Sequence, residues 1–210
     1  MRRRDDVATQ PAGADPGRPL SVRQRLSLVV GTGISAETAI DMDDAKIDYE
    51  FLLSNGVRAP LLKAAKIMPV QLKARGATSP SHFKALEFST LDLVDAAFCA
   101  SCVAAYGAND LLDEFLTTPQ DAVALAGSPA VDQLGLDVGT LLVLCCGAPD
   151  MAAEVLLQMQ PRGACLAGVA PETLLDTGLR AKRLNELGFN AEALSRQTQA
   201  SIVDLDKLGF

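Results

Sequence analysis

Apolar residues recur in pairs five positions apart along this chain, and the clearest pairs lie near its end. Leu184 is followed by Phe189, and Leu205 by Phe210, with a glycine directly before each phenylalanine. A glycine one position beyond a helix cap adopts the left-handed conformation at little steric cost. The flanking apolar residues then occupy the two positions that touch in a Schellman helix stop. The pattern therefore predicts a short helix that ends at Gly188 and another that ends at Gly209.

The same spacing continues toward the N-terminus. Successive second members of the pairs fall ten or eleven residues apart, and glycine precedes many of them, which indicates a repeat of about ten residues. The predicted pairs are Leu52/Val57, Leu62/Ile67, Leu72/Ala77, Phe83/Phe88, Leu93/Phe98, Val103/Ala108, Val131/Leu136, Val143/Ala148, Ala164/Val169, Leu174/Leu179, Leu184/Phe189 and Leu205/Phe210. The glycines before a second member are Gly56, Gly76, Gly107, Gly135, Gly147, Gly168, Gly178, Gly188 and Gly209.

Prolines and N-cap residues give an independent signal for helix starts. Most prolines beyond the N-terminal region follow a predicted stop by two or three residues, where the missing N–H of a first helical residue costs nothing. Residues of N-cap type flank these starts, namely Ser79, Thr118, Ser128 and Asn190. Start and stop signals thus alternate with one period.

A unit of ten residues leaves room for a helix of about two turns, which is marginal in water unless it packs on neighbours. We therefore predict an all-α, solenoid-like array of short helices over residues 25–210, with two units forming a helix pair of about 20 residues. A compact globule of irregular short helices is the alternative. Residues 1–24 are charged and rich in proline and glycine, and they predict an extended basic arm.

The composition agrees with a helical protein. Hydrophobic residues make up 49% of the 210 residues and aromatic residues only 4%, so the core consists mainly of Leu, Ala and Val. The longest apolar run, residues 139–148, is too short to span a membrane, and no apolar segment follows the arginines near the start. We expect a soluble intracellular protein that does not insert into membranes.

One stretch resembles a known family of helical repeats. In residues 51–72, FLLSNGVRAPLLKAAKIMPVQL, the paired leucines, the glycine and the prolines resemble the repeats of mitochondrial transcription termination factors. The resemblance implies alternating short helices and a basic surface that binds nucleic acid. The net charge of −7 opposes the second implication, and we expect no direct contact with nucleic acid.

A glycine-rich stretch at residues 26–40 is a candidate for nucleotide binding. Gly31-Thr32-Gly33 begins a G-x-G-x-x-A match after an apolar run, and such glycines allow a backbone to approach a pyrophosphate. The stretch also resembles the NAD-binding opening of sirtuin deacylases, which implies a small NAD-type enzyme. Val29, Gly33 and Ile34 equally fit the helix-stop pattern, which we prefer because no strand–helix alternation follows.

The remaining candidates for chemistry have simpler structural interpretations. Five cysteines, two of them in the Cys99–Cys102 C-x-x-C, lie in apolar surroundings and are predicted to be buried thiols rather than a zinc or redox site. The single histidine, His82, is expected to be partly exposed on a helix. We expect no catalytic residue, no metal ligand and no cofactor.

Charge is strongly segregated along the chain. Residues 46–84 carry seven bases and two acids, whereas residues 85–161 carry eleven acids and neither Lys nor Arg. We predict a non-enzymatic scaffold whose acidic middle contacts a basic protein or another copy, within an assembly such as a virion, a cytoskeletal complex or a ribonucleoprotein. A simpler interpretation is that the acids keep an apolar protein soluble. The candidate partner-binding residues are Arg2, Arg3, Arg4, Arg18, Asp110, Asp113, Glu114 and Asp121.

Overall fold

The computed structural model describes residues 47–160 and 166–210, and this part of the chain is helical throughout, without a strand. The all-α prediction is therefore confirmed for the described residues. The predicted arm at residues 1–24 and the Gly31–Gly33 stretch lie outside them.

Short helices follow one another with starts that are mostly ten or eleven residues apart, as the sequence repeat predicts. Twelve of the fifteen described helices are six to eleven residues long. They are α3 (Tyr49–Ser54), α4 (Ala59–Ala64), α5 (Pro69–Lys73), α6 (Pro80–Ala85), α7 (Thr90–Leu93), α8 (Ala96–Tyr106), α9 (Ala108–Phe115), α10 (Pro119–Ala126), α11 (Ala130–Leu134), α12 (Val138–Leu144), α13 (Pro149–Met159), α14 (Pro171–Thr177), α15 (Ala181–Glu186), α16 (Ala191–Thr198) and α17 (Ile202–Leu208).

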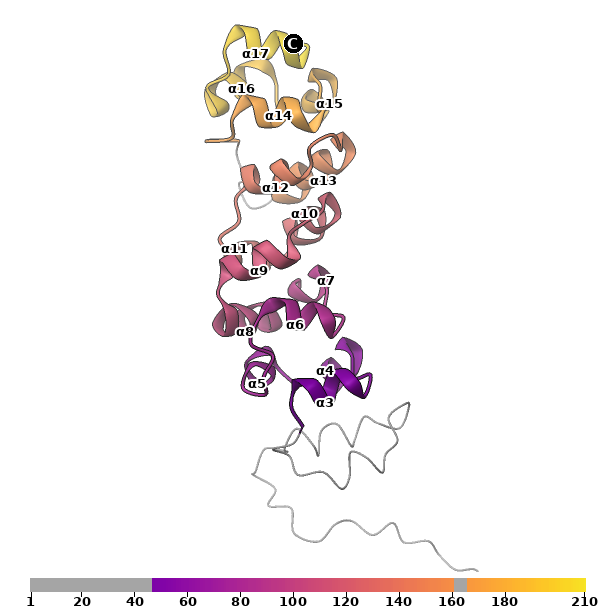
Figure 1. The fold of residues 1–210 in the computed structure, drawn as a ribbon. Coiled ribbons are helices and arrows are strands. Elements are labelled where there is room, and N and C mark those ends of the chain that lie inside the picture. The colour runs from indigo at the N-terminus through magenta and orange to yellow at the C-terminus, as the bar shows by residue number, and fades with distance from the viewer. Residues whose placement is uncertain (1–46, 161–165) are drawn as a thin grey trace, which may run out of the picture.

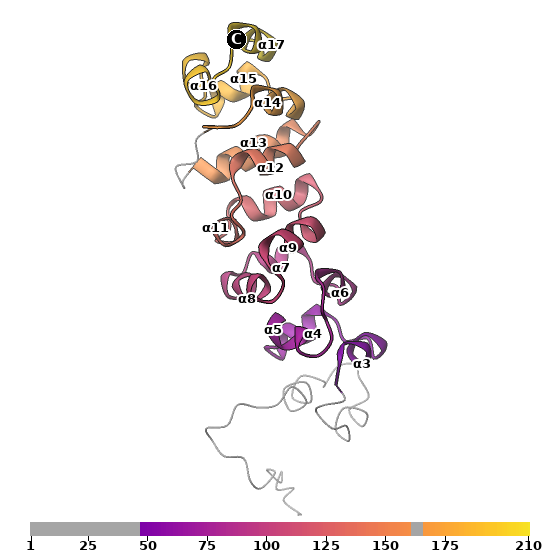
Figure 2. The same cartoon turned by 60° about the vertical axis from the view of Figure 1, so that its left-hand side comes forward.

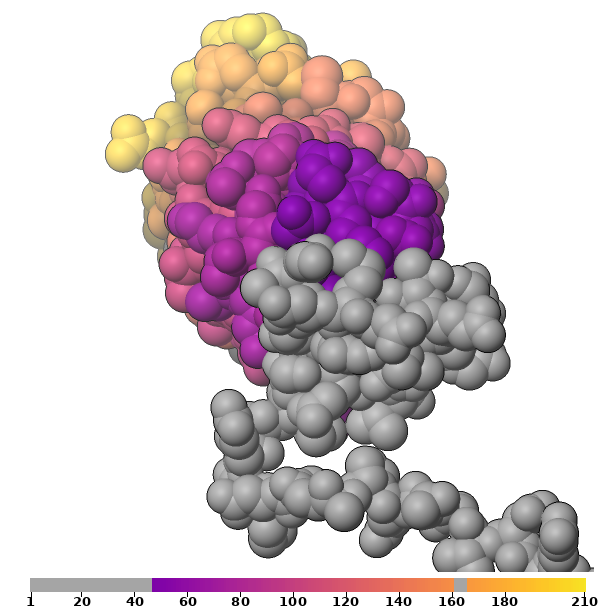
Figure 3. All heavy atoms as spheres, turned by 60° about the horizontal axis from the view of Figure 1, so that its bottom comes forward, coloured from indigo at the N-terminus to yellow at the C-terminus, as the bar shows by residue number. Residues whose placement is uncertain are grey.

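The helices are stacked into an elongated body that runs from α3 at one end to α17 at the other (Figures 1 and 2). Figure 3, seen toward the N-terminal end, shows the later segments following behind the first helices. Three columns of helices run along the body. The first column contains α3, α6, α9, α12, α14 and α17, the second α4, α7, α10, α13 and α15, and the third α5, α8, α11 and α16.

Packing between helices follows these columns. Within the second column, α10 packs on both α7 and α13, and within the third, α8 packs on both α5 and α11. In the first column, α14 packs on both α12 and α17. A helix therefore meets a neighbour about 30 residues away, and three helices make one layer. This corrects the predicted pairing unit of about 20 residues. Three two-turn helices turn the chain through a full circuit, whereas a single pair would have to reverse it.

The helix stops have the conformation that the glycines predict. All nine of the predicted glycines have positive φ, including Gly178 at 82° and Gly188 at 87°. The backbone N–H of Phe189 donates to the carbonyl of Leu184 at 2.8 Å, which is the long hydrogen bond of a Schellman stop. Seven of the predicted pairs make this bond, at 2.8 to 3.1 Å: Leu52/Val57, Leu62/Ile67, Leu72/Ala77, Phe83/Phe88, Val131/Leu136, Leu184/Phe189 and Leu205/Phe210.

Three residues other than glycine also adopt the left-handed conformation. Lys66, Glu87 and Gln199 have φ of 53°, 65° and 57°, and each stands directly before a buried apolar residue. They occupy the same place in the repeat as the glycines. The backbone geometry of the repeat is thus kept even where the side chain opposes it.

The predicted helix starts are largely confirmed. Thr118 and Asn190 are N-caps whose side chains accept the N–H of Asp121 and of Ala193. Ser79 is the N-cap of α6. Ser128 lies one residue before the N-cap, which is Pro129, although its hydroxyl still accepts the N–H of Ala130 at 3.3 Å.

Two predicted pairs do not belong to the core. Val143 is 62% exposed and its partner Ala148 is half-buried, because α12 instead buries Leu141, Leu142 and Cys145. Val103 and Ala108 are half-buried, since α8 continues as one helix past the expected stop. No glycine precedes Phe98, so nothing in that segment favours a left-handed residue.

The core contains a third repeated position that the pair pattern misses. The first residue of several helices is buried, including Tyr49, Pro69, Pro80 and Thr90. The N–H groups of Tyr49 and Ala59 donate to the carbonyls of Arg75 and Leu86, at 2.7 and 2.8 Å. Helix starts are therefore joined through the backbone to segments some 26 or 27 residues later, which links successive layers.

Candidate protein-interaction surface

Basic side chains of the first layers pair with acids of the layers that follow. Arg58 Nε donates to Glu87 Oε1 at 3.1 Å, and Lys63 Nζ pairs with Asp92. Lys84 Nζ lies 3.5 Å from Glu114 Oε1 and also donates to the Glu114 backbone carbonyl at 2.6 Å. The partners are 29 or 30 residues apart. Part of the charge segregation in the sequence is therefore neutralised within the chain, between consecutive layers.

A second group of acids caps helices. Asp95 and Asp137 accept the N–H groups of Phe98 and Thr140 at the starts of α8 and α12, at 2.8 and 2.7 Å. These carboxylates stabilise the helix starts, where the backbone N–H groups lack partners and the helix dipole favours negative charge.

Asp121 belongs to this second group and is held by several hydrogen bonds. Its carboxylate accepts the hydroxyl of Thr90 at 2.6 Å, the hydroxyl of Thr118 at 2.7 Å and the backbone N–H of Thr118 at 2.9 Å. Burial alone would raise the pKa of Asp121, but the hydrogen bonds from Thr90, Thr118 and Thr117 outweigh it, and the pKa lies below its ordinary value. Two of the four predicted acidic partner residues, Glu114 and Asp121, thus make defined contacts inside the chain.

The other two, Asp110 and Asp113, are exposed on α9 and form no ion pair within the described part of the chain. Asp113 is the sixth residue of α9, two positions after Leu111, which is fully buried. Two residues correspond to a rotation of about 200° around a helix. Asp113 therefore points away from the core, on the outer side of the first column.

The same helix position continues along the first column. The sixth residues of α12 and α14 are Val143 and Asp176, and each again follows a fully buried leucine, Leu141 and Leu174, by two positions. We name the surface formed by Asp110, Asp113, Val143, Glu172 and Asp176 the outer acidic face. It presents four exposed carboxylates with an exposed valine between the two acidic helices, α9 and α14.

Sequence reasoning missed Glu172 and Asp176 because they lie beyond the stretch without positive charge. Their helix position could have revealed them, since the second and sixth residues of each helix face outward when the fourth is buried. The predicted basic contacts Arg2, Arg3, Arg4 and Arg18 lie outside the described residues.

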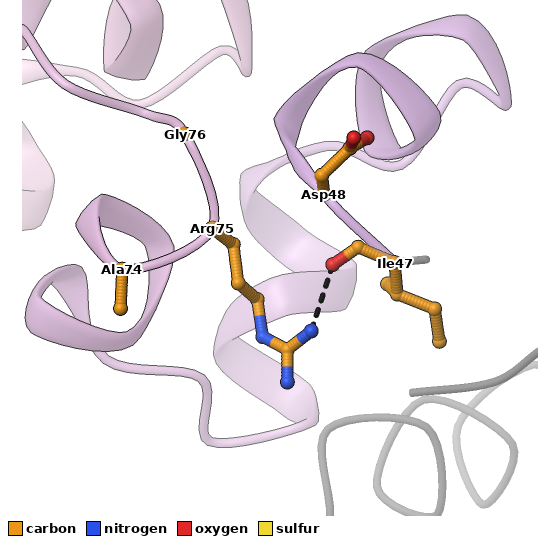
Figure 4. Close-up of a pocket in the computed structure, with 5 residues that line it drawn as sticks. All are labelled: Ile47, Asp48, Ala74, Arg75 and Gly76. Atoms are coloured by element: carbon orange, nitrogen blue, oxygen red, sulfur yellow. Dashed lines mark hydrogen bonds between the residues drawn. The ribbon is translucent and has the colours of Figure 1, made fainter. Parts of the chain in front are cut away.

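A shallow hollow near the N-terminal end of the body is lined by Ile47, Asp48, Ala74, Arg75 and Gly76 (Figure 4). The guanidinium of Arg75 donates to the carbonyl of Ile47 at 2.8 Å, and Asp48 caps α3 by accepting the N–H of Phe51. Both charged groups already make structural contacts. The hollow combines no nucleophile with a base, so its arrangement suits layer closure rather than chemistry.

The predicted thiol environment is confirmed for three cysteines and is wrong for one. Cys99, Cys102 and Cys145 are buried, and burial raises the pKa of each thiol. Cys146 is exposed because α12 ends at that point and buries Cys145 instead. Cys165 lies outside the described residues. Among the residues with a described position, no group of His, Cys, Asp and Glu is arranged to hold a metal ion.

His82 is half-buried, as expected for a helix histidine. Its ring stacks on Tyr49 with 4.4 Å between the ring centroids, and its Nδ1 accepts the N–H of Thr78 at 3.1 Å. Because Glu87 and Asp92 pair with Arg58 and Lys63, neither carboxylate is available to act with this histidine. Its contacts join α3 to α6 in the first column.

None of the described helices is both long enough and apolar enough to cross a membrane. Comparison with known proteins gives no match to any protein-family model, any curated protein or any solved structure.

Proposed function

We propose that this protein is a non-enzymatic scaffold: an α-solenoid of short helices whose acidic surface binds a basic protein partner within a larger assembly. The layered contacts at about 30 residues support the solenoid interpretation, since each layer packs mainly on the layers next to it. Repeat bodies of this kind offer long side surfaces to partners.

The observation that carries the proposal is the distribution of uncompensated charge. Glu87, Asp92 and Glu114 are neutralised by bases of the preceding layer, whereas the four carboxylates of the outer acidic face have no such partner in the described residues. Exposed like charges repel one another and lower the stability of the fold. A partner with Lys and Arg on its surface would relieve that repulsion and would be guided to this face.

The test is affinity capture from the native extract at low salt, followed by elution with increasing salt. We expect a defined basic protein to be retained by the wild-type protein and lost when Asp110→Asn and Asp113→Asn are combined. Glu154→Gln combined with Glu186→Gln is the matched control, because it removes two exposed charges from the second column. Retention that is equal for all three proteins would refute a binding role for the outer acidic face.

A further inference from the structure

The outer side of α12 differs from the rest of the first column around it. Its second residue is Gly139 and its sixth is Val143, so its outward surface carries no charge and an apolar side chain that is 62% exposed. Below it, α9 presents Asp113, and above it, α14 presents Glu172 and Asp176. An apolar surface between carboxylates suits a short segment in which apolar residues lie between basic ones.

The chain itself contains such a segment. Residues 18–25, RPLSVRQR, place Leu20 and Val22 between Arg18 and Arg23 and carry three arginines without an acid. We propose that this segment of a second copy binds along the outer acidic face, with Leu20 and Val22 on Val143 and with Arg18 and Arg23 at the carboxylates of α9 and α14. The proposal rests on the proposed function, because it names a partner for the same surface.

The dimensions of the two surfaces agree. Packed helices lie about 8 to 10 Å apart, so two layers separate Asp113 from Asp176 by roughly 16 to 20 Å. An extended chain rises about 3.3 Å per residue, so the five steps from Arg18 to Arg23 span roughly 17 Å. Pro19 favours an extended chain at this point. Arginine suits both ends, because its guanidinium donates to a carboxylate through two N–H groups.

The charges of the chain favour a second copy over an unrelated ligand. Residues 1–25 carry six arginines and three aspartates, and the described residues of the acidic stretch, 85–160, carry neither Lys nor Arg. One copy thus contains both a basic segment and an acidic face. Such a contact is heterologous, so it joins copies head to tail into a closed ring or an open chain.

The experiment measures self-association of the purified full-length protein by sedimentation over a range of concentrations, at low and high salt. Neutralising the face with Asp113→Asn and Asp176→Asn is expected to weaken association by about three- to tenfold, which corresponds to two exposed ion pairs. Arg18→Gln combined with Arg23→Gln is expected to weaken it equally. High salt should weaken the wild-type association and change these variants less.

Charge exchange makes the test specific. One variant carries Asp113→Arg and Asp176→Arg, the other Arg18→Asp and Arg23→Asp, and each alone should fail to associate. Their mixture should associate, because an acidic segment then meets a basic face. The control mixture replaces the face variant by Glu154→Arg and Glu186→Arg on the second column. Thermal melting of every variant confirms that the helical body is retained.

Three results would overturn the inference: a wild-type protein that is monomeric at all concentrations, variants that associate like wild type, or a control mixture that associates as strongly as the matched one. A monomeric purified protein that still binds a basic protein from its native extract would refute the second copy and leave the proposed function intact.

Discussion

Replacing Gly188 by alanine tests the helix stop on which the repeat depends. Gly188 has φ of 87°, and an added Cβ would meet no other atom within 4 Å. The substitution therefore introduces no clash, and its effect comes from the backbone alone. A left-handed conformation costs a residue with a Cβ about 1 to 2 kcal/mol. Alanine recovers about 0.4 to 1 kcal/mol by restricting the unfolded chain. We expect a net loss of about 1 kcal/mol.

The converse substitution, Gln199→Gly, provides the matched control. Gln199 is exposed, is the C-cap of α16 and has φ of 57°. Glycine relieves the strain there but increases the entropy of the unfolded chain, so stability should stay unchanged or rise by up to about 1 kcal/mol.

Urea denaturation followed by circular dichroism measures both variants, and a change of 1 kcal/mol shifts the melting temperature of a domain this size by about 2 to 4 °C. A Gly188→Ala protein as stable as wild type, together with a destabilised Gln199→Gly protein, would refute the assignment of this position as the repeated stop.

Three further predictions concern the interior, the thiols and the nucleotide alternative. Thr90→Val should destabilise the protein by about 1 to 3 kcal/mol, because the Thr90 hydroxyl serves both the Phe115 carbonyl, at 2.8 Å, and the Asp121 carboxylate. The lowered pKa of Asp121 contributes stability above its ordinary value that is lost as the pH falls through the folded pKa, so acid titration of the variant should show a smaller loss; unchanged acid sensitivity would contradict this. In a Cys165→Ser background, a thiol reagent should modify Cys146 in the folded protein and the three buried cysteines only after unfolding, and mass spectrometry of the modified peptides would expose any other order. Adding NAD or ATP should leave the melting temperature unchanged, whereas a ligand at 100 times its Kd would stabilise the protein by about 2.7 kcal/mol and revive the role of Gly31 and Gly33.

The sequence predicts the ends of the helices better than their neighbours. Glycine signals each left-handed position chemically, and all nine glycines could be placed correctly. At Lys66, Glu87 and Gln199 the same conformation is imposed by packing of the following residue, so no residue type reveals it. Val143 shows the converse error, since apolar character at the right spacing could not indicate that α12 buries Leu141 and Leu142 instead.

The outer acidic face could be predicted only in part, for a related reason. The excess of acids pointed to Asp110 and Asp113, but it could not separate them from Glu114 and Asp121, which bond to Lys84 and Thr90 about 30 residues earlier. Partners at that distance depend on the number of helices in a layer. Once three helices per layer are known, the helix position of each acid separates inward, capping and outward carboxylates, and it adds Asp176 to the face.

The mass of the protein's native complex tests the central claim most directly. Sedimentation of a gentle extract at low salt should place the protein in a particle much heavier than its 22.1 kDa chain. That particle should dissociate at high salt and should fail to form with Asp110→Asn and Asp113→Asn. A protein that sediments as a single chain at low salt, with or without the two substitutions, would contradict the account.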